Sequence, residues 1–325
     1  MRNAAAGQAQ ACTSTSSSRT MQTSSTPAPA QAPAPAQVDS YPLLEKWQQS
    51  PNSWLLRFAL PPNRQYLGDD PTLPTCISVH HNDTHDADDN GDDSDKKKKK
   101  LLKKSYSPVS HPSTIGTFDL LVKSYPYQPG GGVGAAICDL QPGQYLVGKL
   151  KAERMVHGSP IVSNRWDNIG LIAGGTGIAP LLQIVRIVLE DGNDTTKIRL
   201  LNINRYEEDI LMREELDRLE RQHPDRFAVS YSLTGDGISD DWKGHTGRGS
   251  VEMAREALPP PSAEGGGTST TMIFVCGTDG FRDMWAGPVG RGPPKADGTK
   301  GPKIQGPLLG LLRDAGYHAT DVFKY

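Results

Sequence analysis

The sequence lacks several features that mark large classes of protein. No run approaches the about 20 apolar residues that a membrane-spanning helix needs, so no transmembrane segment is expected. The formal net charge is only −2, so no overall positive field would attract nucleic acid. The four cysteines, Cys12, Cys76, Cys138 and Cys276, show no Cys-x-x-Cys spacing. This scatter predicts reduced thiols in an intracellular protein and no metal site.

Aromatic residues are also scarce, at 6% of the chain, whereas 34 glycines and 26 prolines are present among the 325 residues. Three segments are polar and poor in large apolar residues: 1–40, 82–100 and 286–307, of which the last is rich in glycine and proline. We expect a disordered tail or targeting segment at 1–40, a disordered insert at 82–100 and a loop insert at 286–307. The rest of the chain is long enough for two ordinary domains.

Two of these segments have an unusual charge pattern. The first contains Arg2 and Arg19 but no acidic residue before Asp39. This Ser-rich start without acidic residues resembles an organelle transit peptide, but it lacks the clear amphipathic periodicity of one. The expected location is therefore the mitochondrion or the cytoplasm. In the second, an aspartate-rich stretch precedes the run Lys96–Lys100. This composition is typical of a solvated loop, and docking of an acidic partner or a membrane surface is the alternative.

The most informative stretch runs from Asn168 to Asp191. An apolar run of strand length leads into the turn Gly174–Gly177, and apolar residues at helical spacing follow, with Pro180 in the first turn. Glycines let the backbone approach a phosphate, and a helix start favours an anion. A tight turn without a ligand is the alternative, because the third glycine and the later carboxylate of a full dinucleotide fingerprint are missing.

Strands and helices alternate around this stretch, which predicts a parallel sheet covered on both faces. The apolar runs 197–203, 227–233 and 271–276 are expected strands, and a last strand is expected at 317–325. Helices are expected at 207–221, between 249 and 259, and at 308–315. We assign residues 161–325 to this α/β domain. Before it, the segments 54–62, 76–80, 117–125 and 145–150 predict the strands of an antiparallel β-barrel domain over residues 41–160.

Three segments of the second domain together resemble the NADH–cytochrome b5 reductase family, which belongs to the ferredoxin–NADP reductase-like flavoenzymes. They are Ile172–Pro180, Asn202–Leu216 and Val275–Gly277. In the first domain, Lys-Lys-Ser-Tyr-Ser-Pro-Val-Ser at 103–110 is similar to the flavin motif of that family, Arg-x-Tyr-Ser/Thr-x-x-Ser. The resemblance covers roughly Ser53 to Tyr325. It implies an antiparallel β-barrel FAD-binding domain followed by an α/β parallel-sheet NAD(P)H-binding domain.

The resemblance also implies a role for each residue that matches a family motif. Tyr106 would cover one face of the flavin ring, Ser107 would donate a hydrogen bond near flavin N5, and Cys276 would lie beside the nicotinamide. The candidate catalytic residues are therefore Ser107 and Cys276. The candidate cofactor-binding residues are Lys104, Tyr106, Ser107, Pro108, Val122, Lys123, Tyr125, Gly132, Val133, Gly134, Gly174, Gly175, Thr176, Gly177, Pro180, Cys276 and Gly277.

The chain departs from the family pattern at three places. Lys104 stands where the family has arginine, which keeps the charge but loses the two-pronged fork. Gly134 replaces the serine of a phosphate-binding helix start, and Cys276-Gly277 continues as Thr-Asp instead of Pro-x-x-Met. An ordinary packed turn or strand end is the alternative at each place, and weaker binding of FAD would be one consequence.

The expected function is that of an FAD-dependent oxidoreductase that takes a hydride from NADH and passes electrons to a haem protein such as cytochrome b5. NADPH stays open as a donor, although Arg205 is isolated in the sequence and no arginine cluster for a 2′-phosphate is apparent. The alternatives are a flavin reductase for ferredoxin or an oxygenase component, and a flavin-less paralogue with a binding role. A monomer is expected.

Overall fold

The computed structural model describes residues 38–83, 100–125, 132–151, 154–262, 269–294, 296 and 301–325. The expectations for residues 1–37 and 84–99 therefore concern parts of the chain outside the described residues. Within the described residues, no helix is both long and apolar enough to cross a membrane.

The first domain is a six-stranded antiparallel sheet. Its strands are β1 (Val38–Ser50), β2 (Ser53–Ala59), β3 (Ile77–Asp83), β4 (Lys100–Tyr106), β5 (Thr117–Lys123) and β6 (Tyr145–Leu150), in the order β4-β3-β6-β1-β2-β5. Alternate residues point to one side and form its core, in which Phe58 stacks on Phe118 at 5.5 Å and Tyr41 meets Phe118 edge-on. The helix α1 (Val133–Asp139) packs on this core through Val133 and Ile137.

The longest strand of this domain, β1, is absent from the strands that the sequence predicts. It begins at Val38, inside the polar segment 1–40, and pairs with both β2 and β6. Pro42 and a largely polar composition hide it, because only Tyr41 and Leu43 place large apolar side chains in the core. At the insert, residues 82, 83 and 100 belong to the paired strands β3 and β4.

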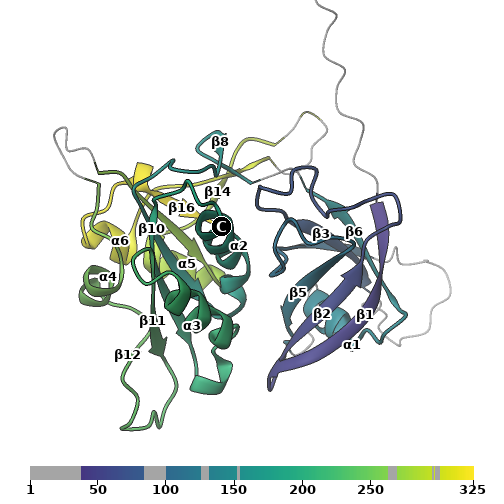
Figure 1. The fold of residues 1–325 in the computed structure, drawn as a ribbon, viewed down its shortest axis with the longest axis horizontal. Coiled ribbons are helices and arrows are strands. Elements are labelled where there is room, and N and C mark those ends of the chain that lie inside the picture. The colour runs from purple at the N-terminus through teal and green to yellow at the C-terminus, as the bar shows by residue number, and fades with distance from the viewer. Residues whose placement is uncertain are drawn as a thin grey trace, which may run out of the picture. The chain divides into compact units, whose positions relative to one another are not determined.

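The second domain is a parallel sheet covered on both faces, as the alternating pattern predicts (Figure 1). Its strands are β9 (Asn168–Gly174), β10 (Lys197–Asn204), β11 (Phe227–Leu233), β12 (His245–Thr246), β13 (Thr271–Cys276) and β16 (Val322–Lys324), in the order β12-β11-β10-β9-β13-β16. The helices α2 (Ile178–Glu190) and α3 (Arg213–Gln222) pack on one face. The helices α4 (Val251–Ala257), α5 (Asp279–Ala286) and α6 (Gly310–Asp314) pack on the other.

Two helices differ from the sequence expectation. Residues 207–221 do not form one helix: a single 3-10 turn, η2 (Glu207–Asp209), is followed by α3, which begins at Arg213. Met212 has φ 59°, a left-handed conformation that interrupts the helix, while Ile210 and Leu211 are buried. At the C-terminus, α6 is shorter than 308–315, and a 3-10 turn, η3 (Ala319–Asp321), takes up part of the expected last strand.

The polar segment 286–307 contains a small hairpin, β14 (Gly290–Arg291) paired with β15 (Lys303–Ile304). Its base is fixed to the last strand. The buried ammonium of Lys324 lies within hydrogen-bond distance of four carbonyl oxygens, those of Pro288, Gly306 and Pro307 at 2.8–3.3 Å and that of Ala286 at 3.3 Å. The side chain of Gln305 exchanges two hydrogen bonds with the backbone of Lys324. A second hairpin, β7 (Met155–Val156) with β8 (Ser159–Pro160), lies between the two sheets in the sequence.

Candidate active site

A cavity of about 820 Å³ is lined by residues of both sheets. Its size falls within the range of about 300–1,000 Å³ that is usual for small-molecule sites. Six cationic side chains line it, whereas no carboxylate side chain among the described residues does. These cations are Lys104, Lys123, Lys151, Arg154, Lys303 and Lys324, although the buried ammonium of Lys324 is bound to carbonyls at the hairpin base. The charge of the cavity therefore favours an anionic ligand.

The end of β4 forms one wall. Lys104, Tyr106 and Ser107 line the cavity there, as three of the candidate residues in the flavin-like motif. Burial raises the pKa of the Tyr106 hydroxyl, so its ring is neutral at ordinary pH. The Ser107 side chain has no hydrogen-bond partner among the described residues, and its hydroxyl is free to bind a ligand. Pro108 is buried behind this wall, bridged to Leu120, and does not line the cavity.

The next wall comes from the end of β5 and the start of α1. Lys123, Tyr125, Gly132 and Gly134 line the cavity. By contrast, the side chains of Val122 and Val133 are 1% exposed and belong to the core of the first sheet. Any contact of these two valines with a ligand would have to come from the backbone.

Gly134 explains one departure from the family motif. An added Cβ at this position would lie 2.7 Å from the backbone oxygen of Lys123. A serine would therefore push α1 away from β5, and the chain fits a glycine here. Gly132, just before the helix, has φ 84°, which only glycine adopts without strain.

The glycine turn lies at the carboxyl end of β9, one of the two central strands of the parallel sheet. Gly174 ends β9, and Gly175 to Gly177 form the 3-10 turn η1, which leads directly into α2. Gly175 has φ 54°, and an added Cβ on Gly177 would lie 2.1 Å from the carbonyl oxygen of Cys276. The turn therefore packs directly on the end of β13. Gly174, Thr176, Gly177 and Pro180 line the cavity, while Gly175 lines a neighbouring pocket.

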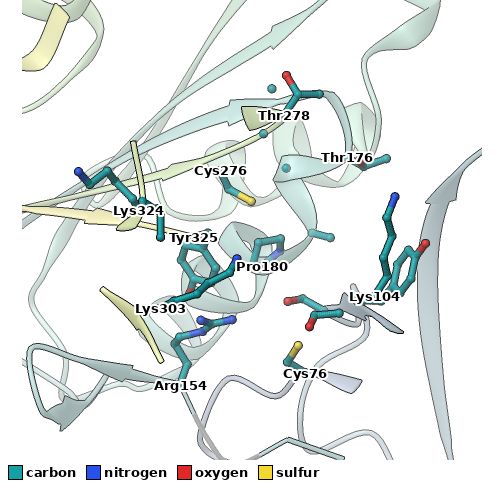
Figure 2. A pocket seen from close by; sticks show the side chains of 18 of the residues that line it. Cys76, Lys104, Arg154, Thr176, Pro180, Cys276, Thr278, Lys303, Lys324 and Tyr325 are labelled. Atoms are coloured by element: carbon teal, nitrogen blue, oxygen red, sulfur yellow. The ribbon is translucent and has the colours of Figure 1, made fainter. Parts of the chain in front are cut away.

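Cys276 and Gly277 complete this wall, and Figure 2 shows Cys276 among Thr176, Thr278 and Pro180. Burial raises the pKa of the Cys276 thiol to about 12. The thiol is therefore protonated at neutral pH and is a poor nucleophile. Cys276 is suited to shape the cavity rather than to attack a substrate.

A fourth wall was not predicted in full from the sequence. Phe323 and Tyr325 line the cavity together with Arg154, and the Arg154 guanidinium lies 4.6 Å from the centre of the Tyr325 ring. Figure 2 shows Arg154, Lys303 and Tyr325 gathered together. Lys303 comes from the hairpin β14–β15, and its pKa is lowered by burial and by nearby cations, which include Lys151 and Arg154. No signal in the sequence located Arg154 or Lys303 at this wall.

A smaller pocket of about 170 Å³ adjoins the cavity, since Lys123, Tyr125, Gly174 and Thr278 line both. It follows the carboxyl ends of the parallel strands, where ligands of open α/β sheets bind. Arg205 and Arg248 both line it. Among the described residues, no cluster of three histidine, cysteine, aspartate or glutamate side chains is placed to hold a metal ion.

The residues of the cavity fit FAD and a nicotinamide dinucleotide. Lys104 and Lys123 offer positive charge for a pyrophosphate, and Gly132 and Gly134 form part of the wall without a side chain that would block a ligand. The Tyr325 hydroxyl is buried in the cavity wall without a hydrogen-bond partner among the described residues. A buried polar group of this kind calls for a partner that a polar ligand would supply.

Comparison with known proteins agrees with this geometry. Residues 94–151 match the family described as Oxidoreductase FAD-binding domain, and residues 171–286 match Oxidoreductase NAD-binding domain. NADH-cytochrome b5 reductase 2 of Neurospora crassa is 33% identical over 222 residues, which are 68% of this chain and 58% of that protein. The NADH-cytochrome b5 reductase-like protein of Arabidopsis thaliana is 35% identical, with 68% and 60% covered. The matches thus span about three fifths of these relatives.

Among solved structures, the cytochrome b5 reductase domain of Ulva prolifera nitrate reductase has the same fold. Its TM-score is 0.63 at 24% identity, with 89% of this chain and 97% of that chain covered. The antiparallel sheet, the parallel sheet and both family matches occur in the order that the sequence resemblance implies. The chain therefore belongs to the ferredoxin–NADP reductase-like flavoenzymes, the family that includes the NADH–cytochrome b5 reductases.

Proposed function

We propose that this chain is an FAD-dependent oxidoreductase that takes a hydride from NADH and passes electrons to a haem protein such as cytochrome b5. The observation that carries the proposal is one cavity with two kinds of wall. The flavin-like motif at Tyr106 and Ser107 faces the same space as the glycine turn Gly174–Gly177 and Cys276. Bound FAD would supply the chemistry, since a flavin accepts a hydride and can release its electrons singly.

The side chains of this chain would position the reactants. The neutral ring of Tyr106 would stack on the flavin, and the free Ser107 hydroxyl would donate a hydrogen bond to it. Gly174 and Gly177 would let the donor approach closely, with Thr176 between the two sites. Such alignment is the main contribution of the protein to a hydride transfer.

Hydride transfer does not require a proton acceptor, and the walls of the cavity contain few groups that could serve as one. No Asp or Glu side chain of the described residues lines it, and the single described histidine that lines it, His157, is an exposed residue of the turn between β7 and β8. Asp279, the carboxylate nearest to Cys276 in sequence, is paired with Arg282 and does not line the cavity. We therefore infer that the hydride step depends on alignment and on the flavin environment.

The visible spectrum of the purified protein, before and after anaerobic NADH, tests the proposal. We expect a yellow protein with about one FAD per chain and a flavin band that bleaches with NADH. A preparation that stays colourless after excess FAD would refute the flavin assignment.

Turnover with cytochrome b5, compared with ferredoxin under the same conditions, then tests the acceptor. Faster reduction of ferredoxin would overturn the haem-protein part of the proposal.

A further inference from the structure

The smaller pocket beside the main cavity lies where the adenosine half of a dinucleotide would extend. Gly174, Asn204 and Thr234 line it, and they stand at or just after the carboxyl ends of β9, β10 and β11. It shares Gly174 and Thr278 with the main cavity. If the nicotinamide lies near Cys276, as the proposed function requires, the adenosine ribose falls in this pocket.

The charge of the pocket is unusual for a site that binds NADH alone. Sites specific for NAD commonly place an Asp or Glu after the second strand to bind the ribose 2′-hydroxyl, whereas an Arg there accommodates a 2′-phosphate. Here β10 ends at Asn204, and Arg205 follows it. The lining cations are Lys123, Arg205 and Arg248, against the single carboxylate Asp209.

Neither arginine is neutralised by another described residue. Among the described residues, the guanidinium groups of Arg205 and Arg248 form no hydrogen bond or ion pair. Arg205 lies over the ring of its neighbour Tyr206, with 5.3 Å from the guanidinium carbon to the ring centre. In the sequence the two arginines are far apart, and only the fold brings Arg248 to the same pocket as Arg205.

The backbone that carries Arg248 is held firmly on both sides. Gly247 donates its N–H to the Leu233 carbonyl at 2.8 Å, and its own carbonyl accepts the Ser232 hydroxyl at 2.7 Å. The Arg248 carbonyl accepts the indole N–H of Trp285 at 3.2 Å. The backbone at Arg248 is therefore held in place, while its exposed guanidinium has no partner among the described residues and is available to an anion.

We propose that Arg205 and Arg248 bind the 2′-phosphate of NADPH, so that this chain uses NADPH as well as NADH. A phosphate dianion can accept two-pronged hydrogen bonds from each guanidinium, a geometry that lysine does not offer. The inference rests on the proposed function, because it places the nicotinamide in the main cavity. It goes beyond that function by naming the residues that set the choice of nucleotide.

Calorimetric titration of the full chain, carrying its FAD, tests the phosphate site without turnover. The probes are adenosine 2′,5′-bisphosphate, adenosine 3′,5′-bisphosphate and adenosine 5′-monophosphate at one ionic strength. We expect the 2′,5′ compound to bind at least about tenfold more tightly than either of the others, since it alone places a second phosphate at the arginines. Equal binding of the two bisphosphates would show attraction by charge alone and would overturn the proposal.

Single substitutions then identify the residues. Arg205→Ala and Arg248→Ala should each remove most of the advantage of the 2′,5′ compound and lower the ratio of kcat/KM for NADPH to that for NADH. The matched control is Arg221→Ala, an exposed arginine at the end of α3 that lines neither pocket. If both pocket variants keep the wild-type ratio, these arginines do not set nucleotide choice.

The failure of this inference and that of the proposed function give different results. Reduction of the flavin by NADH, together with equal binding of adenosine 2′,5′-bisphosphate and adenosine 5′-monophosphate, would overturn the phosphate site and leave the proposed function intact. No reduction by either nucleotide, with no binding of any adenosine compound, would overturn both.

Discussion

At the scale of single residues, Ser107 carries the clearest prediction about the reaction. Its free hydroxyl lines the cavity beside Tyr106. Loss of a positioned donor commonly costs about 10²–10³ in rate, and we expect a smaller loss for Ser107→Ala because the stacking residue stays. Stopped-flow measurement of flavin reduction by NADH gives this loss in rate, and the FAD content of the variant should be nearly unchanged. Asp279→Asn, in an 89% exposed side chain, should change the rate little. The reverse pattern would show that the active site is assigned wrongly.

Gly134 gives a prediction about packing. Its replacement by the family's serine puts a Cβ at 2.7 Å from the Lys123 carbonyl oxygen, so α1 must shift. Overpacking of this kind costs about 1–3 kcal/mol, and we expect Gly134→Ser to lower the free energy of unfolding by that amount. Gly280→Ala is the control, because an added Cβ there meets nothing within 4 Å. Urea denaturation of both variants measures the difference, and equal stabilities would contradict the close packing seen here.

His111 gives a prediction about pH. Its Nδ1 accepts the Ser113 N–H at 3.1 Å, and its Nε2 lies 3.2 Å from Glu190. Burial lowers the pKa of His111 from 6.5, and the charge of Arg186 lowers it further, although Glu190 opposes the shift. As pH falls below 6.5, the unfolded chain therefore takes up a proton that the folded chain resists, and stability falls until the folded pKa is reached.

The size of this effect is about 1.4 kcal/mol for each unit by which the two pKa values differ. The variant His111→Gln should not show this pH effect. The free energy of unfolding of the wild type minus that of the variant should therefore decrease as pH falls from 7.5 to 5.5. Urea denaturation at both values measures this change. A difference that widens at low pH would mean that the folded state favours the charged imidazole.

At the scale of elements, the strands with simple apolar patterns could be predicted from the sequence. The strands β6 and β13 lie where the runs 145–150 and 271–276 place them. The strand β1 could not be predicted, since it is stabilised by pairing with β2 and β6 rather than by its own composition. The break at Met212 depends on tertiary packing of Ile210 and Leu211, which a helical pattern cannot reveal.

The hairpin β14–β15 depends on one lysine. Lys324 is 4% exposed, and its ammonium donates to carbonyls on both sides of the hairpin base. Lys324→Met keeps most of the apolar side chain but leaves these carbonyls without their donor. We expect a loss of about 2–3 kcal/mol in the free energy of unfolding, and early proteolysis within 288–306. Lys197→Met, at an exposed position of β10, should stay within about 0.5 kcal/mol of wild type.

At the scale of the whole molecule, the candidate site could be predicted only in part from the sequence. Motifs of adjacent residues, such as Tyr106-Ser107 and the glycine turn, were recognisable because their spacing is local. Arg154, Lys303 and Arg248 were not, because each reaches its pocket through the packing of elements distant in the sequence. Long-range placement of this kind leaves no periodic signal in a single chain.

The contact between the two domains also depends on such a residue. Arg186 of α2 pairs with Glu215 of α3 at 2.5–2.8 Å and donates to the Val109 carbonyl, which belongs to the loop after β4. Val109 and Leu121 of the first domain join the apolar cluster around α2. Arg186, whose side chain is 12% exposed, is therefore the polar link in a largely apolar contact.

Arg186→Ala should weaken this contact. It leaves the Val109 carbonyl without its donor and Glu215, 20% exposed, with only the Arg218 partner at 3.8 Å. A buried polar group that loses its partner costs about 1–3 kcal/mol, which is the expected loss in the free energy of unfolding. Arg218→Ala removes a half-exposed ion pair of the same glutamate and should cost less than about 1 kcal/mol.

Urea denaturation followed by both flavin and tryptophan signals measures the two variants. For Arg186→Ala the two signals should separate, because each domain then unfolds more independently. Coincident transitions at wild-type stability would show that the apolar contact alone joins the domains.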